Sequence, residues 1–422
     1  MSRMSFGFSS LLLVVACGGG GNSVTPPPTN STVAAHAGDG QTALDGTPVA
    51  IAPAVRVTDA AGAPVAGSGV TFTAASGGGH ITQGTTTTDP NGVAAVGAWT
   101  LGRLGGNTTS AINTLVATVA GNDITGNPVT FSANAWGNSW ASKQSLGTPR
   151  AALALGTVNG VVYAVGGAAV GGVVQIPSEA YNPATNSWSN KAGLGTARAN
   201  LGVGVVGNDL YAVGGTDHNF TPTGTVEVYN PTTDSWAGRT DMPTPRAYLG
   251  VEVLNGVLYA VGGWAGDTAL GTVEAYNPAT DSWTTRASLP TPRMGLAVAA
   301  LDGVLYAVGG AGHNGQETAI VEAYNPATNS WSTRASLPAG RMEFALAAHN
   351  GLLYAIGGWK NSGAMSAGVD AYDPESNTWS PRSSMPTLRC KVGITVMNGL
   401  LYVAGGYDYT GQWHGELEVY QP

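Results

Sequence analysis

The sequence predicts an all-β protein in two parts, a β-sandwich followed by six repeated four-stranded sheets. The first observation is the composition, since 63 of the 422 residues are Gly and only 10% are charged. Long amphipathic helices need charged faces, so this composition argues against a helical protein. The second is a Gly pair that recurs six times, at intervals of 47 or 48 residues, between residues 166 and 406. The hydrophobic share of 43% is ample for a packed core. The net charge of -8 argues against nucleic acid and anionic membrane surfaces as main partners.

The N-terminal segment is predicted to be an export signal. Residues 1–16 contain Arg3 and then an apolar run that is too short to span a membrane. The run Val14-Val15-Ala16-Cys17 resembles a bacterial lipobox, which implies cleavage before Cys17 and lipidation of its thiol. Residues 17–29 are rich in Gly and Pro and suit a tether. The expected protein is exported and lipid-anchored to the cell envelope, with the outer membrane or cell surface favoured; an ordinary signal peptide is the alternative.

Residues 30–134 are predicted to form the β-sandwich. Short β-branched runs such as 54–58, 70–73, 115–119 and 129–132 alternate with turn clusters about every ten residues. The segments 57–65 and 88–94 resemble bacterial Ig-like domains of the invasin type. That resemblance implies an Ig-like β-sandwich that serves as a stalk module.

Residues 136–422 hold the repeats. In each repeat an Arg precedes the first strand, Leu-Tyr-Ala-Val or a close variant precedes the Gly pair, an acid-x-Tyr strand follows, and a Trp lies in the fourth strand. This pattern resembles kelch repeats, which implies a six-bladed β-propeller. The chain ends after the third strand of the sixth repeat, so the strand around Trp140 is expected to complete the last blade and remove an open edge.

Two sets of charged residues occur once per repeat. The arginines are Arg150, Arg198, Arg246, Arg293, Arg341 and Arg389. The acids are Glu179, Glu227, Glu274, Glu322, Asp370 and Glu418. One interpretation is an ion pair or turn contact that every blade needs. The other is a ring of arginines that captures an anionic ligand, because in some kelch proteins this arginine lines the binding pocket.

A third set differs from repeat to repeat and supplies the candidate ligand site. Two positions after each Arg stand Ala152, Asn200, Tyr248, Gly295, Glu343 and Lys391, which are expected to ring one mouth of the central channel. Of these, Asn200, Tyr248, Glu343 and Lys391 are candidate ligand-binding residues. Glu252 is expected deeper in the channel with a raised pKa. The alternative is that channel water solvates these side chains.

The loops after the Gly pairs also differ, and kelch topology places them on the same face. Their candidate ligand-binding residues are His218, Trp264, His313, Trp359, Tyr407, Trp413 and His414. Exposed aromatic groups beside polar ones suit a sugar or a peptide, while aromatic caps over blade edges are the alternative. No nucleophile elbow, P-loop or HExxH motif is present, and no metal or cofactor is expected.

Together these features predict a monomeric cell-surface lipoprotein in which an Ig-like spacer carries the propeller. The propeller is expected to bind a protein or carbohydrate ligand without catalysis. Two alternatives remain. One is a carbohydrate-active enzyme of the sialic-acid mutarotase or epimerase kind, since that bacterial kelch group is also six-bladed. It would require Glu343, Tyr248 and Arg341 to converge. The other is a purely structural envelope protein.

Overall fold

The structure, a computed structural model, describes residues 26–105, 108–174, 177–360 and 364–422. Their contacts divide the chain into two compact units, of which the second holds residues 134–422 with two short earlier segments. The expected signal peptide of residues 1–16, the lipidation at Cys17 and the tether as far as residue 25 lie outside the described residues.

Between residues 26 and 136 the described part of the chain forms ten strands, here called the N-terminal β region. They are β1 (Thr32–Ala37), β2 (Gln41–Leu44), β3 (Ala54–Thr58), β4 (Gly69–Ser76), β5 (His80–Thr82), β6 (Thr85–Thr87), β7 (Val93–Ala95), β8 (Ala98–Thr100), β9 (Ser110–Val119) and β10 (Val129–Trp136). One sheet has the order β1-β3-β7, a second has the order β2-β10-β9-β4-β6, and β5 pairs with β8. Val57, Phe72, Trp99, Leu115 and Phe131 are buried and form its core.

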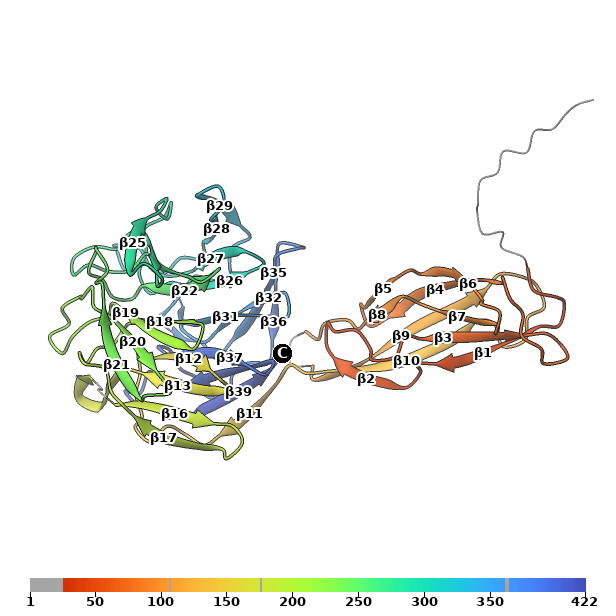
Figure 1. Cartoon of the computed structure of the whole chain (residues 1–422), viewed down its shortest axis with the longest axis horizontal. Coiled ribbons are helices and arrows are strands. Elements are labelled where there is room, and N and C mark those ends of the chain that lie inside the picture. The colour runs from red at the N-terminus through yellow and green to blue at the C-terminus, as the bar shows by residue number, and fades with distance from the viewer. Residues whose placement is uncertain (1–25, 106–107, 175–176, 361–363) are drawn as a thin grey trace, which may run out of the picture. The chain divides into compact units, whose positions relative to one another are not determined.

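Six four-stranded sheets, the blades, follow within the described residues, and Figure 1 shows them arranged around a central axis. Blades one to three are β12 (Ala154–Val158), β13 (Val161–Val165), β16 (Ser178–Asn182), β17 (Ser187–Lys191); β18 (Gly202–Val206), β19 (Asp209–Val213), β20 (Val226–Asn230), β21 (Ser235–Arg239); and β22 (Gly250–Leu254), β23 (Val257–Val261), β24 (Val273–Asn277), β25 (Ser282–Thr285). Blades four and five are β26 (Ala297–Leu301), β27 (Val304–Val308), β28 (Val321–Asn325), β29 (Ser330–Arg334); and β31 (Ala345–His349), β32 (Leu352–Ile356), β35 (Val369–Asp373), β36 (Thr378–Arg382). The sixth is β37 (Gly393–Met397), β38 (Leu400–Ala404), β39 (Leu417–Gln421) and β11 (Ser139–Lys143).

Short elements decorate the loops between the second and third strands of two blades. In blade one these are β14 (Ala168–Ala169), the 3₁₀ turn η1 (Val170–Gly172) and β15 (Val173–Val174). In blade five they are β33 (Trp359–Lys360) and β34 (Ala364–Met365), and β33 also pairs with β30 (Arg341–Met342), which precedes the first strand of that blade. In every blade the inner strand begins four residues after the repeated Arg, so the candidate residues two positions after the Arg precede it.

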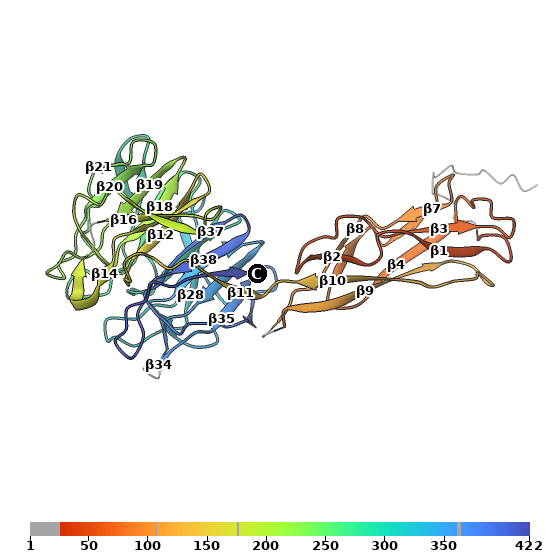
Figure 2. The same ribbon diagram turned by 90° about the horizontal axis from the view of Figure 1, so that it is seen from below.

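The sixth blade takes its outer strand from the start of the propeller. β11 pairs antiparallel with β39, and Trp140 lies opposite Tyr420 with ring centroids 4.9 Å apart. The indole of Trp140 also donates a hydrogen bond to the carbonyl of Ser383, at 2.8 Å. Both views place β11 beside the C-terminal end of the chain (Figures 1 and 2). The ring is therefore closed by hydrogen bonds within one sheet, with no open edge at the seam.

The Gly pairs join each blade to the next. Gly214 has a φ of +63°, and a Cβ there would lie 2.6 Å from the carbonyl oxygen of Arg246, closer than real Cβ atoms approach. Gly215 donates its N–H to that same carbonyl at 3.0 Å. Corresponding bonds join the other blades, from Gly167 to Arg198 through to Gly406 to Arg150. Only glycine permits this close backbone contact, which explains why the pair recurs in each repeat.

Candidate functional site

A closed ring of six backbone hydrogen bonds surrounds the channel mouth. It is formed by the residues two positions after each Arg, and each of them donates its N–H to the carbonyl of the equivalent residue in the preceding blade. The bonds run Asn200 to Ala152, Tyr248 to Asn200, Gly295 to Tyr248, Glu343 to Gly295, Lys391 to Glu343 and Ala152 to Lys391, all at 2.8–3.0 Å. The ring fixes the backbone from which the variable side chains project.

All six members of this mouth ring have left-handed backbone conformations. Their φ angles lie between +53° and +61°, and five of the six are not glycine. This conformation costs an L-residue roughly 1–2 kcal/mol. Non-glycine residues held in such regions tend to mark functional sites. Tyr248 and Glu343 are therefore held in a conformation that their residue types do not favour.

Three side chains of the mouth ring contact one another. The ammonium Nζ of Lys391 lies 3.3 Å from Oε1 of Glu343 and 5.6 Å from the ring centroid of Tyr248. Tyr248 in turn packs edge-on against Trp264, with centroids 6.2 Å apart and an interplanar angle of 78°. Asn200 makes a side-chain hydrogen bond to Tyr248, so the structure brings together all four candidate residues of this set. It adds two loop candidates, Trp264 against Tyr248 and Trp359 through a side-chain hydrogen bond to Glu343.

Burial governs the electrostatics of this group. It raises the pKa of Glu343, and the nearby Lys391 opposes that shift only in part. Burial alone would lower the pKa of Lys391, but electrostatic attraction to Glu343 and to the ionisable hydroxyl of Tyr248 outweighs it, and the pKa rises. Burial also raises the pKa of Tyr248, so its hydroxyl stays protonated at neutral pH. A cation, a carboxyl group and a phenol are thus available together at the mouth.

Two cavities of about 310 Å³ each adjoin Tyr248 and Phe220. The lysine cavity is lined by residues that include Asn200, Thr216, Asp217, His218, Lys391, Tyr407 and Trp413. The glutamate cavity is lined by Trp264, Met294, Gly295, Met342 and Glu343 besides the two shared aromatic residues. Each is at the lower end of the size range of small-molecule sites, about 300–1,000 Å³.

The six repeated arginines do not line these cavities. They are 0–1% exposed, and each pairs with the strand-three acid of its own blade, as Arg246 pairs with Glu274. The same guanidinium donates to the carbonyls of Thr244 and Ala260 at 2.9 and 3.0 Å. The expectation that Arg150, Arg198, Arg246, Arg293, Arg341 and Arg389 meet a ligand is therefore corrected. Their hydrogen bonds are made within the blades, because a buried guanidinium needs such partners.

Glu252 lies in the central channel, a cavity of about 430 Å³ lined by the inner strands. Its Oε1 accepts a hydrogen bond from the N–H of Val253 at 2.8 Å. Burial raises the pKa of Glu252 to about 7. On the channel wall the hydroxyls of Thr157 and Thr395 bond to each other at 2.9 Å. The Glu252 carboxyl thus belongs to the channel and not to the two cavities at the mouth.

The candidate loop residues fall into three groups. Trp264 lines the glutamate cavity, while His218, Tyr407 and Trp413 line the lysine cavity. His313 is exposed and lines neither of them. Trp359 pairs through its backbone with Met342 in the short strands β30 and β33, and its side chain makes a hydrogen bond to Glu343. Within the described residues no three His, Cys, Asp or Glu side chains form a group able to hold a metal ion.

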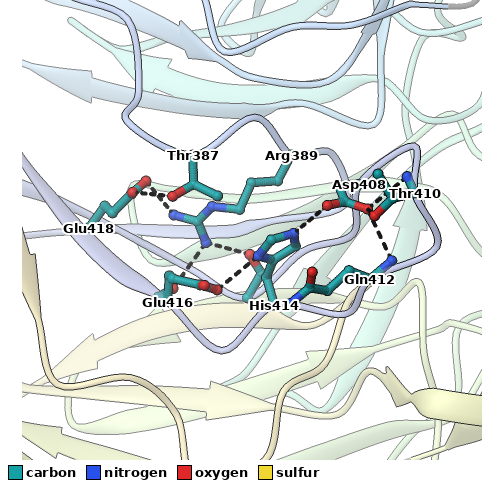
Figure 3. Close-up of polar contacts among 9 residues, drawn as sticks. Thr387, Arg389, Asp408, Thr410, Gln412, His414, Glu416 and Glu418 are labelled. Atoms are coloured by element: carbon teal, nitrogen blue, oxygen red, sulfur yellow. Dashed lines mark hydrogen bonds and ion pairs between the residues drawn. The ribbon is translucent and has the colours of Figure 1, made fainter.

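His414 is buried and lies between two carboxylates. Its Nδ1 is 2.9 Å from Oε2 of Glu416, and its Nε2 is 3.2 Å from Oδ2 of Asp408 (Figure 3). Asp408 Oδ1 also accepts from the N–H groups of Thr410 and Gln412 at 2.9 and 3.0 Å. This network holds the loop that carries Tyr407 and Trp413.

Three side chains that line the glutamate cavity were absent from the candidate ligand-binding residues. Phe220 is 63% exposed at the rim of both cavities, and Met294 and Met342 line the glutamate cavity. The two methionines stand where other repeats have Ala247 or Ala199, so replacement of a small residue by a long one was the available signal.

No helix in the described part of the chain is long and apolar enough to cross a bilayer.

Comparisons with known proteins concern the second unit. The KLHDC2/KLHL20/DRC7 Kelch-repeats domain matches residues 154–358, and the Kelch motif matches residues 340–386 and 388–422. A solved structure described as "Structure of YjhT" superposes with a TM-score of 0.56 at 17% identity, over 66% of this chain and 96% of that chain. At that identity the likeness extends to the fold alone. No curated protein sequence matches the chain.

Proposed function

Residues 154–422 of this chain form a kelch-repeat β-propeller, and we propose that it is a non-catalytic recognition head that binds a protein or carbohydrate ligand at its mouth. The observation that carries the proposal is the asymmetry of the mouth ring. Six equivalent backbone positions carry Ala, Asn, Tyr, Gly, Glu and Lys, although the ring itself needs only their N–H and C=O groups. Packing does not require Tyr248, Glu343 or Lys391, so recognition of a ligand is the simplest reason for them.

The two cavities support binding of a small group or of a protruding segment of a larger partner. Both combine aromatic walls with a single charged member of the mouth ring, Lys391 in one and Glu343 in the other. Tyr and Trp provide a large contact area at a small cost in conformational entropy. Phe220 and Tyr409 are 63% and 70% exposed, which suits contact with a partner beyond the cavities.

The geometry favours binding over carbohydrate catalysis. An epimerase or mutarotase site was expected to bring Arg341 to Glu343 and Tyr248. The side chain of Arg341 is instead buried, pairs with Asp370 and donates to the carbonyl of Ala355 at 3.2 Å. Lys391 is the cation beside Glu343, and its ion pair with that carboxylate competes with general-base chemistry.

We further propose that the propeller is presented at the cell envelope as a monomer. The apolar run of residues 1–16, Cys17 and the Gly/Pro-rich tether support export and lipid anchoring. The N-terminal β region would then be an Ig-like spacer. Its two main sheets with a common buried core support that role.

A binding screen of the full chain tests the proposal. We expect hits on glycan or peptide arrays that weaken at least about tenfold in Tyr248→Ala and Lys391→Ala, since both line the site. Glu375→Ala, an exposed acid in a turn of blade five, is the matched control and should bind as wild type. Equal binding by all variants would overturn the assignment of the site. Anomer exchange or turnover of a bound sugar, followed by proton NMR, would overturn the non-catalytic proposal.

A further inference from the structure

The glutamate cavity has a chemical character that the lysine cavity lacks. Its walls are three aromatic rings, of Phe220, Tyr248 and Trp264, together with the thioethers of Met294 and Met342. Glu343 is the one charged residue that lines it. The cavity therefore presents π faces and polarisable sulfur around a single negative charge.

The aromatic walls meet at a corner. The rings of Tyr248 and Trp264 are nearly perpendicular, at 78°. Phe220 stands at the rim in a left-handed conformation with a φ of +59°. Asp217 holds that turn by accepting from the N–H groups of Asn219 and Thr221 at 2.8 and 2.9 Å. A phenyl ring kept 63% exposed beside two other rings gains little from packing within the fold.

The ring of Tyr248 already attracts a cation. Nζ of Lys391 lies 5.6 Å from its centroid, within the range of a cation–π contact. Lys391 lines the lysine cavity and is absent from the lining of the glutamate cavity. The carboxylate at the wall of the glutamate cavity is shared with Lys391, whose Nζ lies 3.3 Å from Oε1, while the ammonium itself lines only the lysine cavity.

These features select the ligand group. A primary ammonium needs several hydrogen-bond acceptors, and Glu343 is the only side chain in the lining that is a strong one. A quaternary ammonium spreads its charge over methyl groups, needs no hydrogen bonds and is attracted to aromatic faces. Thioethers are soft and adapt to the shape of such a group. Burial also raises the pKa of Glu343, which a bound cation would counteract.

We propose that the glutamate cavity binds a methylated ammonium group, held by the faces of Tyr248, Trp264 and Phe220 and by the charge of Glu343. This inference rests on the proposed function, because it names a ligand class for the same face of the propeller. The group can come from free choline compounds, from a phosphatidylcholine headgroup or from a trimethyl-lysine side chain. All three share the trimethylammonium chemistry.

The test is calorimetric titration of the full chain with choline and with 3,3-dimethylbutan-1-ol, its uncharged isostere. We expect saturable binding of choline and binding of the isostere at least about tenfold weaker, because the alcohol lacks the charge. Trp264→Ala and Glu343→Gln should each weaken choline binding by about tenfold or more. Glu375→Ala, an exposed acid in a turn of blade five that lines neither cavity, should leave choline binding unchanged. Phosphatidylcholine vesicles and a trimethyl-lysine peptide then show which source binds tightest.

Three outcomes would overturn this inference: no choline binding at millimolar concentration, equal binding of choline and the alcohol, or unchanged choline binding by Trp264→Ala. Far-ultraviolet circular dichroism and thermal melting of each variant separate loss of the site from loss of the fold. The array screen with Lys391→Ala separates this inference from the proposed function. If the array screen finds a ligand whose binding depends on Lys391 but the protein does not bind choline, the recognition head stands and only the methylammonium site is refuted.

Discussion

Lys391 and Glu343 are joined twice, once through the backbone and once through their side chains. The N–H of Lys391 donates to the carbonyl of Glu343 at 2.9 Å, and Nζ lies 3.3 Å from Oε1. The first bond belongs to the repeated ring that every blade contributes to. The second exists only because these two blades carry opposite charges at equivalent positions.

Loss of the lysine side chain should destabilise the propeller through its partner. Lys391→Met removes the cation and leaves a mostly buried Glu343 carboxylate without its ion pair. We expect the free energy of unfolding to fall by about 1–2 kcal/mol in denaturant titrations at pH 7. The double variant with Glu343→Gln should recover most of that loss. Strictly additive losses would show that the two side chains do not interact.

The one glycine of the mouth ring gives a test of backbone strain. A Cβ at Gly295 would meet Cγ of Glu343 at 3.5 Å, which is ordinary van der Waals contact, so Gly295→Ala has room for its side chain. The φ of +61° remains unfavourable for alanine. We expect a loss of about 1 kcal/mol in chemical denaturation with ligand binding retained. Unchanged stability would mean that the ring imposes no strain.

The buried ion pairs should contribute more than any exposed charge. Glu274→Ala leaves Arg246 buried without its carboxylate and leaves the hydroxyl of Thr244 without the acceptor that lies 2.9 Å away. Breaking a buried pair in this way costs about 3–5 kcal/mol. Glu375→Ala, which removes an exposed acid, should change stability by less than about 0.5 kcal/mol. Equal melting temperatures for the two variants would contradict a structural role for the pair.

The channel carboxyl should make stability depend on pH. Burial raises the pKa of Glu252 from 4.5 to about 7, so between these values the folded protein binds more protons at this site than the unfolded chain does. The contribution of this carboxyl group to the free energy of unfolding is fully present below pH 4.5 and is lost as the pH rises to about 7. Wild type should lose about 1–3 kcal/mol more than Glu252→Gln between pH 5 and pH 8. Parallel pH profiles of the two proteins would refute this.

The repeat made the propeller predictable from one chain. The Gly pairs and the Tyr and Trp positions mark the same contacts in every blade, and the predicted kelch β-propeller is confirmed by the family matches. The left-handed conformation of the mouth ring was not predictable from strand alternation. Tyr248 and Glu343 carry no sequence signal for a positive φ, which arises from hydrogen bonds between neighbouring blades.

The candidate site was predictable only where repeats differ. Comparing equivalent positions singled out Tyr248, Glu343 and Lys391, because symmetry does not account for them. The sequence left two interpretations of the arginines open. A residue present in every blade can form a ring that binds an anionic ligand, or it can form one ion pair within each blade. The structure shows that these arginines are buried, which favours ion pairs within the blades over contact with a ligand.

The strand β11 also sets an order on the biosynthesis of the protein. Lys143 pairs with Leu417, so the outer strand of the sixth blade is synthesised before every other blade strand and its partner after the other five blades. Until residues 417–421 leave the ribosome or the export channel, the sixth sheet has no third strand and Trp140 has no Tyr420 to pack on. The ring is therefore completed in a single late step, and an early stop codon or a protease cut near the C-terminus opens it at the seam.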